Sequence, residues 1–461
     1  MVEKINRLIR LILFACGLTA GCLVQPAVAA NGLAIITDAE TQNYLAQIIK
    51  PLFAAGKVTF NPQKIFVVND NSLNAFVSDG NYLFVHSGTL MEAENTNELA
   101  GILAHETGHI IGGHIVRQKL KLEKMQYIML GSIIAAGATA VSTGRGDAAM
   151  AVILGSQSSA LNNMLHYQVQ EERSADESAV KLLTATKQST DGLRKFMNKI
   201  KRQNALSGID ENGYFRTHPL TAERIAHFAE ASKNNHFGSE NKLDAELAMV
   251  KAKLTAFLAD TKKAWRLYPA YKNSPNAKYA HAILFFREGK IKQALETIDE
   301  LLQAQANNPY FHELKGQFLF ESGQVSASVK AYEQALALLP DNHLLQISLA
   351  QAILENTPDR GQTQRAVNLL QKALIKQNNG LCWQLLARAY DMLGNKAYSY
   401  YAAAEFNYSM DNLETALQLL DNAEQNSPDK SLTIKINDLR ERVKTELKDN
   451  PRRDRKSTRL N

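Results

Sequence analysis

Three residues near position 105 have the types and the spacing that metal-assisted hydrolysis requires. His105, Glu106 and His109 form the pattern H-E-x-x-H. Residues four apart lie on one face of a helix, so both imidazoles can point at a single ion, and imidazole is a common zinc ligand. The glutamate between them is placed to take a proton from a water molecule that the ion activates. The pattern predicts a catalytic metal site, with a helix that merely carries two surface histidines as the alternative.

The residues around this pattern predict the helix that carries it. Apolar residues recur at helical spacing between Leu99 and His114. Asn95 and Glu98 have the spacing of a capping box, and the acidic residues around them suit the positive end of a helix dipole. We therefore expect one helix that starts at Asn95 and holds both histidines.

Two histidines leave a catalytic zinc one protein ligand short, so a third ligand is expected on another element. The segment Leu165 to Leu183 reads as a second helix, with Glu172 and Asp176 on one strip. Glu172 is the candidate third ligand. Its neighbour Glu171 points about a hundred degrees away on a helix and is expected to be solvated.

Several blocks in a fixed order resemble the M48 family of zinc metalloproteases. They are a strand pair at Asn74 to Leu90, the H-E-x-x-H helix, the spacing E-x-x-A-D from Glu172 to Asp176, and H-P-x-x-x-x-R-I within Arg216 to Ile225. Together they cover about residues 35 to 230. The resemblance implies a zincin-like domain with a small sheet, one zinc ion per chain and hydrolysis of peptide bonds.

The same resemblance implies a role for each site residue. Glu106 would be the general base, and Asp176 would orient a ligating histidine. His218 would either hydrogen-bond the oxyanion or occupy the fourth position on the metal. Arg224 is expected to be a structural ion-pair partner, and His114 is either a family feature or only a polar residue at the helix end. The implied metal ligands are His105, His109 and Glu172.

The strand that precedes the helix has a candidate role of its own. Alternating residues around the Asp79-Gly80 step predict a hairpin, and an edge strand beside a zinc helix can bind an extended peptide through main-chain hydrogen bonds. A strand that only packs on the helix is the alternative, and the family pattern favours the first interpretation. The predicted substrate-binding residues are Asn74, Ala75 and Phe76.

The N-terminus has the composition of a signal peptide over residues 1–30. Basic residues precede an apolar run from Leu11 to Val24, and small residues then allow cleavage before Ala30 or before Asn31. We therefore expect an exported protein, located in the periplasm by the family resemblance. Lipidation at Cys22 is an alternative, whereas an uncleaved anchor is disfavoured because the apolar run is short for a membrane span.

Between the signal peptide and the metal site, the pattern predicts a helix within Ala30 to Gly56, with Thr37 and Glu40 as a capping box. Two strands are expected, near Val58 to Val68 and Asn74 to Val85. After the metal site, residues 125–143 carry no charge. We interpret about 125–160 as a soluble helical lid over the site, with membrane insertion as the alternative, so membrane association is expected to be peripheral at most.

A change of composition near residue 236 ends the predicted metalloprotease domain, which spans 31–235. Residues 236–275 read as a linker with bridging helices. From 276 to 446 the chain repeats with a period of thirty-four, and the repeats resemble tetratricopeptide repeats. Residues 447–461 form a basic tail that we expect to be disordered. The expected landmarks of the repeats include Gly289, Gly323, Gly361, Gly394, Ala294, Ala366 and Ala416.

Charge and cysteine content exclude some classes of function. The chain has 461 residues and a formal charge of +6, but the surplus lies in the signal peptide and the tail, so the body is neutral. No basic stripe with interleaved aromatic residues is present, which argues against nucleic acid as a partner. Only Cys382 lies outside the signal peptide, so the mature chain has no internal disulfide.

The sequence thus predicts a mainly α fold (α+β), with a zincin-like metalloprotease domain followed by a helical tetratricopeptide-repeat solenoid. The expected function is an exported zinc endopeptidase that degrades misfolded or stalled envelope proteins. By the resemblance, its repeats would recruit unfolded substrates or the outer-membrane protein assembly machinery, and the protein would also act as a chaperone. The alternative is a chaperone or adaptor without enzymatic activity, in which zinc is structural or the site is held inhibited.

Overall fold

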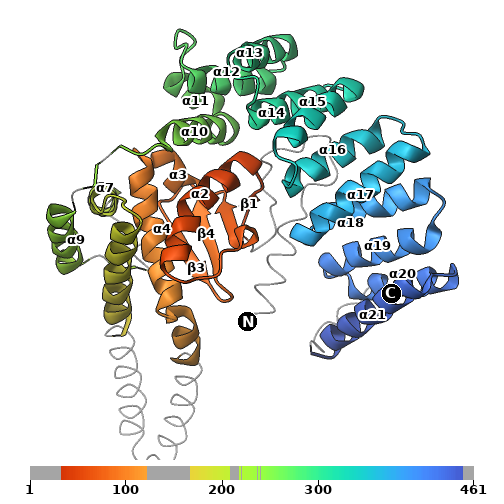
Figure 1. Cartoon of the computed structure of the whole chain (residues 1–461), viewed down its shortest axis with the longest axis horizontal. Helices are drawn as coiled ribbons and strands as arrows, with labels where there is room; N and C mark the ends of the chain where they lie inside the picture. The colour runs from red at the N-terminus through yellow and green to blue at the C-terminus, as the bar shows by residue number, and fades with distance from the viewer. Residues whose placement is uncertain are drawn as a thin grey trace, which may run out of the picture. The chain divides into compact units, whose positions relative to one another are not determined.

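The structure is a computed structural model that describes residues 33–121, 167–207 and 218–449, apart from residues 220, 236 and 239. The chain divides into two units. One runs from Gln42 to Val250, and the other combines the residues up to Thr41 with those from Lys251 onward. The first unit holds the residues predicted to do chemistry, and the second holds the helical repeats (Figure 1).

A small sheet precedes the helix that carries the H-E-x-x-H pattern. Its strand order is β1-β2-β4-β3. β2 runs parallel to β4, whereas β3 and β4 form an antiparallel hairpin in which Ala75 faces Val85. The hairpin turn has positive φ at Gly80 and Asn81, which confirms the predicted hairpin. The strands are β1 (Ile35–Ile36), β2 (Ile65–Val68), β3 (Ala75–Ser78) and β4 (Tyr82–His86).

The first long helix, α2 (Ala39–Ala55), begins later than the sequence pattern suggested. Ile35 and Ile36 form a short strand instead. The capping assignment to Thr37 was wrong, because the Asp38 carboxylate accepts the hydrogen bond from the backbone N–H of Thr41 at 2.8 Å. Either residue has a side-chain oxygen suited to a cap, and spacing alone does not separate adjacent candidates. The first predicted strand was also too long, since η1 (Pro62–Lys64) precedes β2.

The predicted H-E-x-x-H helix is present as α4 (Thr96–Ile111), and its residues from Thr96 to His109 are all buried. The Asn95 side chain accepts a hydrogen bond from the Glu98 backbone N–H, as the capping prediction required. The reciprocal bond of the predicted capping box is shifted by one residue, because the Glu98 carboxylate accepts from the backbone N–H of Glu94. α4 follows α3 (Ser87–Glu92) and packs on β3 and on α7 (Asp191–Ser207), which in turn packs on α9 (Ala222–Asn234).

Ten helices of the second unit form successive pairs, and each helix packs against the next along the chain (Figure 1). α12, α14 and α16 begin at residues 275, 309 and 343, which is the predicted period of thirty-four. They are α12 (Pro275–Arg287), α13 (Ile291–Ala304), α14 (Pro309–Glu321), α15 (Val325–Leu338), α16 (His343–Glu355), α17 (Arg360–Lys376), α18 (Gly380–Met392), α19 (Lys396–Ser409), α20 (Leu413–Gln425) and α21 (Lys430–Asp449).

The landmark residues of the repeats show why the period is visible in the sequence. Gly289, Gly323 and Gly394 each have φ between 74° and 80° in the turn within a helix pair, a conformation that glycine adopts without strain. The landmark alanines are fully buried. Gly361, which was expected to be a landmark like the other three glycines, lies instead in the first turn of α17, and Thr357 has the positive φ of that connection. The mainly helical fold with a small sheet confirms the predicted fold class.

The second unit contains a fully buried cluster of charged residues that the sequence did not predict. Lys253, in α10 (Asp244–Leu258), places its Nζ 2.5 Å from Asp38 Oδ1, 3.3 Å from Glu40 Oε2 and 3.6 Å from Glu313 Oε2. The Tyr279 hydroxyl donates to Glu40 at 2.9 Å. Burial by itself lowers the pKa of Lys253, but Asp38 and the other acidic groups raise it well above its usual value. Lys253 is therefore charged at neutral pH.

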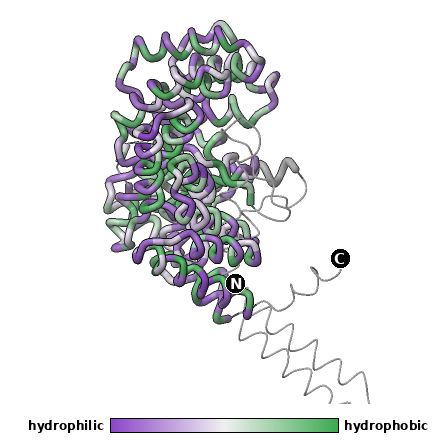
Figure 2. The backbone as a smooth tube through the Cα atoms, turned by 90° about the vertical axis from the view of Figure 1, so that its right-hand side faces the viewer, coloured by the Kyte–Doolittle hydropathy of each residue, from purple (hydrophilic) through white to green (hydrophobic). Residues whose placement is uncertain are grey.

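Hydrophobic and hydrophilic residues alternate along the helices, as the amphipathic packing of helix pairs requires (Figure 2). In the part of the chain that the structure describes, no helix is both long and apolar enough to cross a membrane. The predicted signal peptide and the whole of the predicted lid lie outside the described residues, as does the basic tail from residue 450. The tail was predicted to begin at residue 447, but residues 447–449 still belong to α21.

Candidate metal centre

Two potential ligands come from one face of α4. His105 and His109 are 0% and 6% exposed, and their Nε2 atoms lie 3.1 Å apart. The four-residue spacing places both rings on one side of the helix, as the sequence predicted. The ring planes meet at 76°, so the two nitrogens converge on the same point from different directions.

Glu172 reaches this point from the helix of residues 167–185. Its Oε2 lies 3.3 Å from His105 Nε2, and its Oε1 lies 3.3 Å from His109 Nε2. The two helices approach closely at Gly108, where a Cβ atom would stand only 2.7 Å from the carbonyl oxygen of Ala175. Glycine is therefore needed at this position for the carboxylate to reach both imidazoles.

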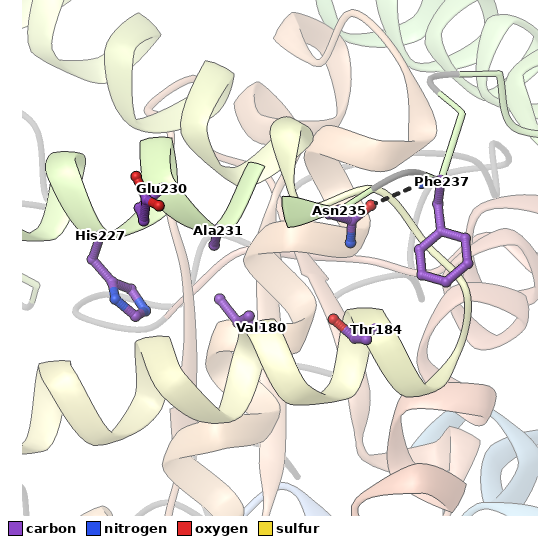
Figure 3. A pocket seen from close by; sticks show the side chains of 7 residues that line it. All are labelled: Val180, Thr184, His227, Glu230, Ala231, Asn235 and Phe237. Atoms are coloured by element: carbon purple, nitrogen blue, oxygen red, sulfur yellow. Dashed lines mark hydrogen bonds between the residues drawn. The ribbon is translucent and has the colours of Figure 1, made fainter. Parts of the chain in front are cut away.

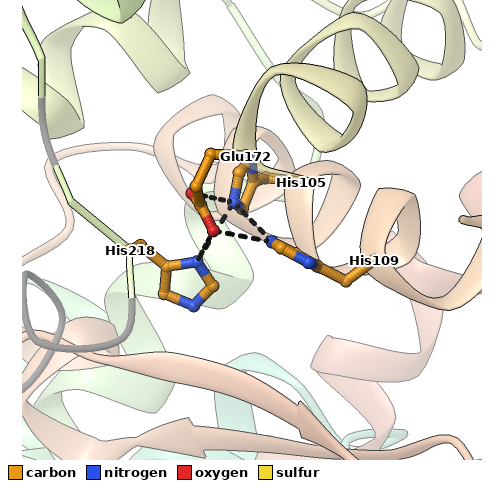
Figure 4. Close-up of side chains that lie close together, drawn as sticks. All are labelled: His105, His109, Glu172 and His218. Atoms are coloured by element: carbon orange, nitrogen blue, oxygen red, sulfur yellow. Dashed lines mark hydrogen bonds and ion pairs between the residues drawn. The ribbon is translucent and has the colours of Figure 1, made fainter. Parts of the chain in front are cut away.

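His218, just before α9, completes the group. Its Nδ1 lies 3.0 Å from Glu172 Oε1 and 3.4 Å from His105 Nε2 (Figure 4). One potential donor atom from each of the four residues lies within 4.8 Å of the others, and this is the one such group found among the described residues. The members of the group are His105, His109, Glu172 and His218.

The donor set fits a zinc ion. Ligand atoms at about 2.0–2.1 Å from a tetrahedral metal are about 3.3 Å from one another, close to the separations found here. The protonation pattern agrees, because His105 Nδ1 lies 2.8 Å from Asp176 Oδ1, which is an acceptor, and so carries the proton. In the neutral form that a metal ion would bind, the ring turns its Nε2 lone pair toward Nε2 of His109 and the carboxylate of Glu172. Converging lone pairs of this kind are stabilised by a cation.

The electrostatics of the group are dominated by burial and by the carboxylates. Burial lowers the pKa of His105, but hydrogen bonds to Asp176 and Glu172 outweigh it and raise the pKa to about 9. Burial lowers the pKa of His109 to about 3. Burial alone would raise the pKa of Glu172, yet His218, His105 and His109 hold it well below its usual range. Glu172 is therefore a carboxylate, as a metal ligand must be.

Arg224 forms ion pairs with both Asp176 and Glu172. Its Nε lies 2.6 Å from Asp176 Oδ2, and its Nη1 lies 2.8 Å from Glu172 Oε2. Nη1 also donates to the carbonyl oxygen of Pro219, next to His218 in the chain. The side chain is only 3% exposed. Arg224 is thus confirmed as an ion-pair partner, and its contact with Glu172 fixes the orientation of that carboxylate.

Glu106 lies beside the group without belonging to it. It is fully buried, and its Oε1 is 3.5 Å from His218 Nε2. Burial raises its pKa, while the positive charges that His218 and His105 can carry oppose the rise. A raised pKa brings a carboxylate closer to the range in which it can both accept and return a proton near neutral pH.

The predicted substrate-binding residues lie in β3 and directly before it. β3 lies at the end of the strand order, so one of its edges has no partner strand among the described residues. Phe76 is only partly buried and stacks on Phe84, whereas Ala75 is fully buried. The backbone of Asn74 is bonded within the unit, because its carbonyl accepts from His86 N–H and from the Thr89 hydroxyl. Farther along β3, the backbone of Val77 is hydrogen-bonded to Glu106. Part of the main chain along this edge is therefore already bonded within the unit.

Glu171 and His114, which lie close to the candidate ligands, are both largely buried. Glu171 was expected to be solvated, but its side chain is 16% exposed and pairs with Lys121 at 2.9 Å. His114, whose role the sequence left open, is 2% exposed, and its Nδ1 lies 2.8 Å from His109 Nδ1. Neither contact follows from helical spacing, because each depends on how the chain turns after α4.

The unit also has a cavity that the sequence did not predict. A hollow of about 570 Å³ lies between the helix of residues 167–185 and α9 (Figure 3). Phe237 lies at one end, where its backbone N–H donates to the Asn235 side chain. The lining includes none of the predicted site residues: it consists of Val180, Thr184, His227, Glu230, Ala231, Asn235 and Phe237.

Three features of this site are typical of the metallopeptidase class. They are a helix with the H-E-x-x-H pattern, a carboxylate from a second helix, and a buried glutamate outside the four-residue group. The comparison with known families agrees. Residues 39–232 match the model of peptidase family M48, and the chain contains a peptidase M48 domain. Metallopeptidases of this family depend on a metal ion, and the four-residue group is able to hold one.

Individual relatives agree with this assignment, and two of them match over most of the chain. The chain is 24% identical to the beta-barrel assembly-enhancing protease of Escherichia coli (strain K12) over 406 residues, which are 84% of this chain and 80% of the relative. It is 23% identical to the putative beta-barrel assembly-enhancing protease of Vibrio cholerae over 86% of this chain and 82% of the relative. The metalloprotease YcaL of E. coli is 28% identical over 40% of this chain and 68% of its own length.

Proposed function

We propose that this chain is a zinc-dependent endopeptidase of the bacterial envelope. The observation that carries the proposal is the convergence of three imidazoles and one carboxylate beside the buried Glu106. In this proposal His105, His109 and Glu172 hold the ion. Asp176 and Arg224 fix the orientation of these ligands through the hydrogen bonds described above.

A zinc ion held there would supply Lewis-acid polarisation of the substrate carbonyl and would lower the pKa of a water molecule. Glu106 accepts the proton of that attacking water and delivers it to the leaving amine. Its burial supports this role, because the raised pKa makes the carboxylate a better acceptor of the proton. An extended substrate would add to the outer edge of β3, near the predicted residues Ala75 and Phe76.

His218 distinguishes two states of such an enzyme. With Nδ1 beside Glu172 and His105, its ring is placed to serve as a fourth ligand, which would exclude water and hold the site inhibited. Turned outward, the same imidazole would hydrogen-bond the oxyanion of the tetrahedral intermediate. The position of Nδ1 in the ligand group favours the inhibited state as the resting one.

The first test measures zinc content and casein degradation for the purified protein and for Glu106→Gln. Both proteins should bind one zinc ion, and only the parent should cleave casein. Glu171→Gln is the matched control, because it removes the neighbouring acidic group on the second helix and should leave cleavage unchanged. Cleavage by Glu106→Gln at the parental rate would overturn the mechanism. His218→Ala should raise the rate if the resting site is inhibited.

We further propose that the repeats recruit substrates or the outer-membrane protein assembly machinery. The support is that the similarity to the beta-barrel assembly-enhancing proteases extends over most of the chain, including the repeats. In the producing organism, loss of the protein should then impair assembly of outer-membrane barrel proteins. Complementation by the parent but not by Glu106→Gln would assign this role to proteolysis, whereas equal complementation would favour the chaperone or adaptor alternative.

A further inference from the structure

His114 contacts His109 because the helix is interrupted between them. On a continuous helix, residues five apart point about 140° away from each other. Here α4 ends at Ile111, and Gly112 and Gly113 form a turn in which Gly113 has φ of +62°. The chain then resumes as the helical residues 114–121. The turn folds His114 back, so that the two rings lie 4.8 Å apart at 82°.

The contact joins the Nδ1 atoms of the two rings at 2.8 Å. His109 turns its Nε2 toward the ligand group, so a metal ion would require the lone pair on Nε2 and the proton on Nδ1. The Nδ1–H of His109 then donates to Nδ1 of His114, and His114 carries its own proton on Nε2. Among the described residues, His114 is the one hydrogen-bond partner of His109 Nδ1.

We propose that His114 is a positioning residue: its Nδ1 lone pair fixes the ring orientation and the tautomer of His109 for metal binding. The proposal rests on the zinc site of the proposed function. In this proposal the two candidate ligands on α4 have different hydrogen-bond partners. His105 is held by the carboxylate of Asp176, whereas His109 is held by a neutral imidazole. His114 itself does not touch the metal or the substrate.

The structure also argues that the ring is held in one place. His114 is 2% exposed, and a Cβ atom on Gly112 would stand 2.2 Å from its Nε2. The close contact with Gly112 leaves the imidazole little room to turn away from His109. Another residue at position 114 could therefore orient His109 only if it placed an acceptor atom at the position of Nδ1.

The test is a zinc titration of the full chain against a chromophoric chelator. His114→Asn places an amide oxygen near the position of Nδ1, and His114→Phe keeps the ring shape without an acceptor. Loss of a partner that orients a ligand typically costs 10- to 100-fold in metal affinity. We expect His114→Phe to bind zinc about 10- to 100-fold more weakly, and His114→Asn to bind within about threefold of the parent.

The matched control is His227→Phe, the same substitution at an exposed histidine of the same unit. Circular dichroism and thermal unfolding of the metal-free proteins show whether each variant folds. If His114→Phe does not fold, His114→Gln replaces it, because its oxygen lies farther out than Nδ1 and should not rescue binding. Parental affinity in His114→Phe, or an equal loss in His114→Asn, would overturn the positioning role alone. A parent that binds no zinc would overturn the proposed function as well.

Discussion

Gly108 offers a direct test of how the second helix reaches the metal site. In Gly108→Ala, the new methyl group would stand 2.7 Å from the carbonyl oxygen of Ala175 and 2.9 Å from its Cα, whereas ordinary contacts begin at 3.4 Å. Both obstacles belong to backbone, so the helix of residues 167–185 must retreat by about half an ångström or more to restore normal packing. Glu172 lies one turn away on that helix and moves with it.

We expect Gly108→Ala to have a small effect on the free energy of unfolding and a larger effect on zinc affinity and cleavage. Crowding in a packed interior costs about 1–3 kcal/mol, and alanine in place of glycine in a helix returns about 1 kcal/mol. The free energy of unfolding should therefore fall by no more than about 2 kcal/mol. A displacement approaching 1 Å at a catalytic group costs up to about a hundredfold in rate. Zinc affinity and casein cleavage should thus fall about 10- to 100-fold while the protein stays folded.

The assay combines zinc titration, cleavage kinetics and chemical denaturation of the metal-free protein. Gly361→Ala serves as the control, since the same substitution in α17 meets nothing closer than an aspartate oxygen at 3.3 Å. If Gly108→Ala kept both zinc affinity and cleavage within twofold of the parent, the inference that close helix approach places Glu172 would be wrong.

Three further predictions concern stability and can be measured by denaturant or thermal unfolding. Lys253→Met should lower the free energy of unfolding of the repeat unit by about 3–5 kcal/mol, because it leaves the buried Asp38 carboxylate uncompensated; an effect below about 1 kcal/mol would contradict this. Burial raises the pKa of Glu321 to about 7, so the folded state binds the extra proton between about pH 4.5 and pH 7 and stability falls as the pH rises through this window. Glu321→Gln should therefore unfold at a higher temperature than the parent at pH 8 and show no such gain at pH 4.5. Zinc at a hundred times its dissociation constant should stabilise the metalloprotease unit by about 2.7 kcal/mol, and Glu172→Ala should abolish the effect.

Local patterns in the sequence predicted the elements that depend on neighbouring residues. The cap at Asn95, the helical spacing of His105 and His109, and the turn glycines of the repeats all act within a few positions of the chain. Caps, helical faces and tight turns require particular residue types at fixed spacing, so they can be recognised in the sequence. The structure confirms the corresponding helix, cap and turns. Glu172 was proposed from the strip of the second helix that it shares with Asp176, and the family resemblance supported it. His218 was identified only through the family resemblance, because nothing local connects it to α4.

The features that the sequence did not reveal depend on which segments meet in three dimensions. Lys253 looks like a solvated residue in its own helix, and only the approach of Asp38, Glu40 and Glu313 turns it into a buried charge. Glu171 is similar, since its partner Lys121 lies fifty residues away. A charged residue in an amphipathic pattern is usually exposed, so burial of this kind cannot be read from spacing.

The arrangement around Arg224 explains why residues so far apart in the chain act as one site. Its guanidinium holds Asp176 with two nitrogens and Glu172 with a third, and the same side chain donates to the backbone next to His218. One buried cation thereby fixes the positions of Asp176, which orients His105, and of the candidate ligand Glu172. It also contacts the segment that carries His218. The planar guanidinium has the several fixed donors that this task requires, and a lysine, with a single ammonium group, could not make the same contacts. The candidate site is therefore assembled by an ion-pair network as much as by the helix that carries its first two candidate ligands.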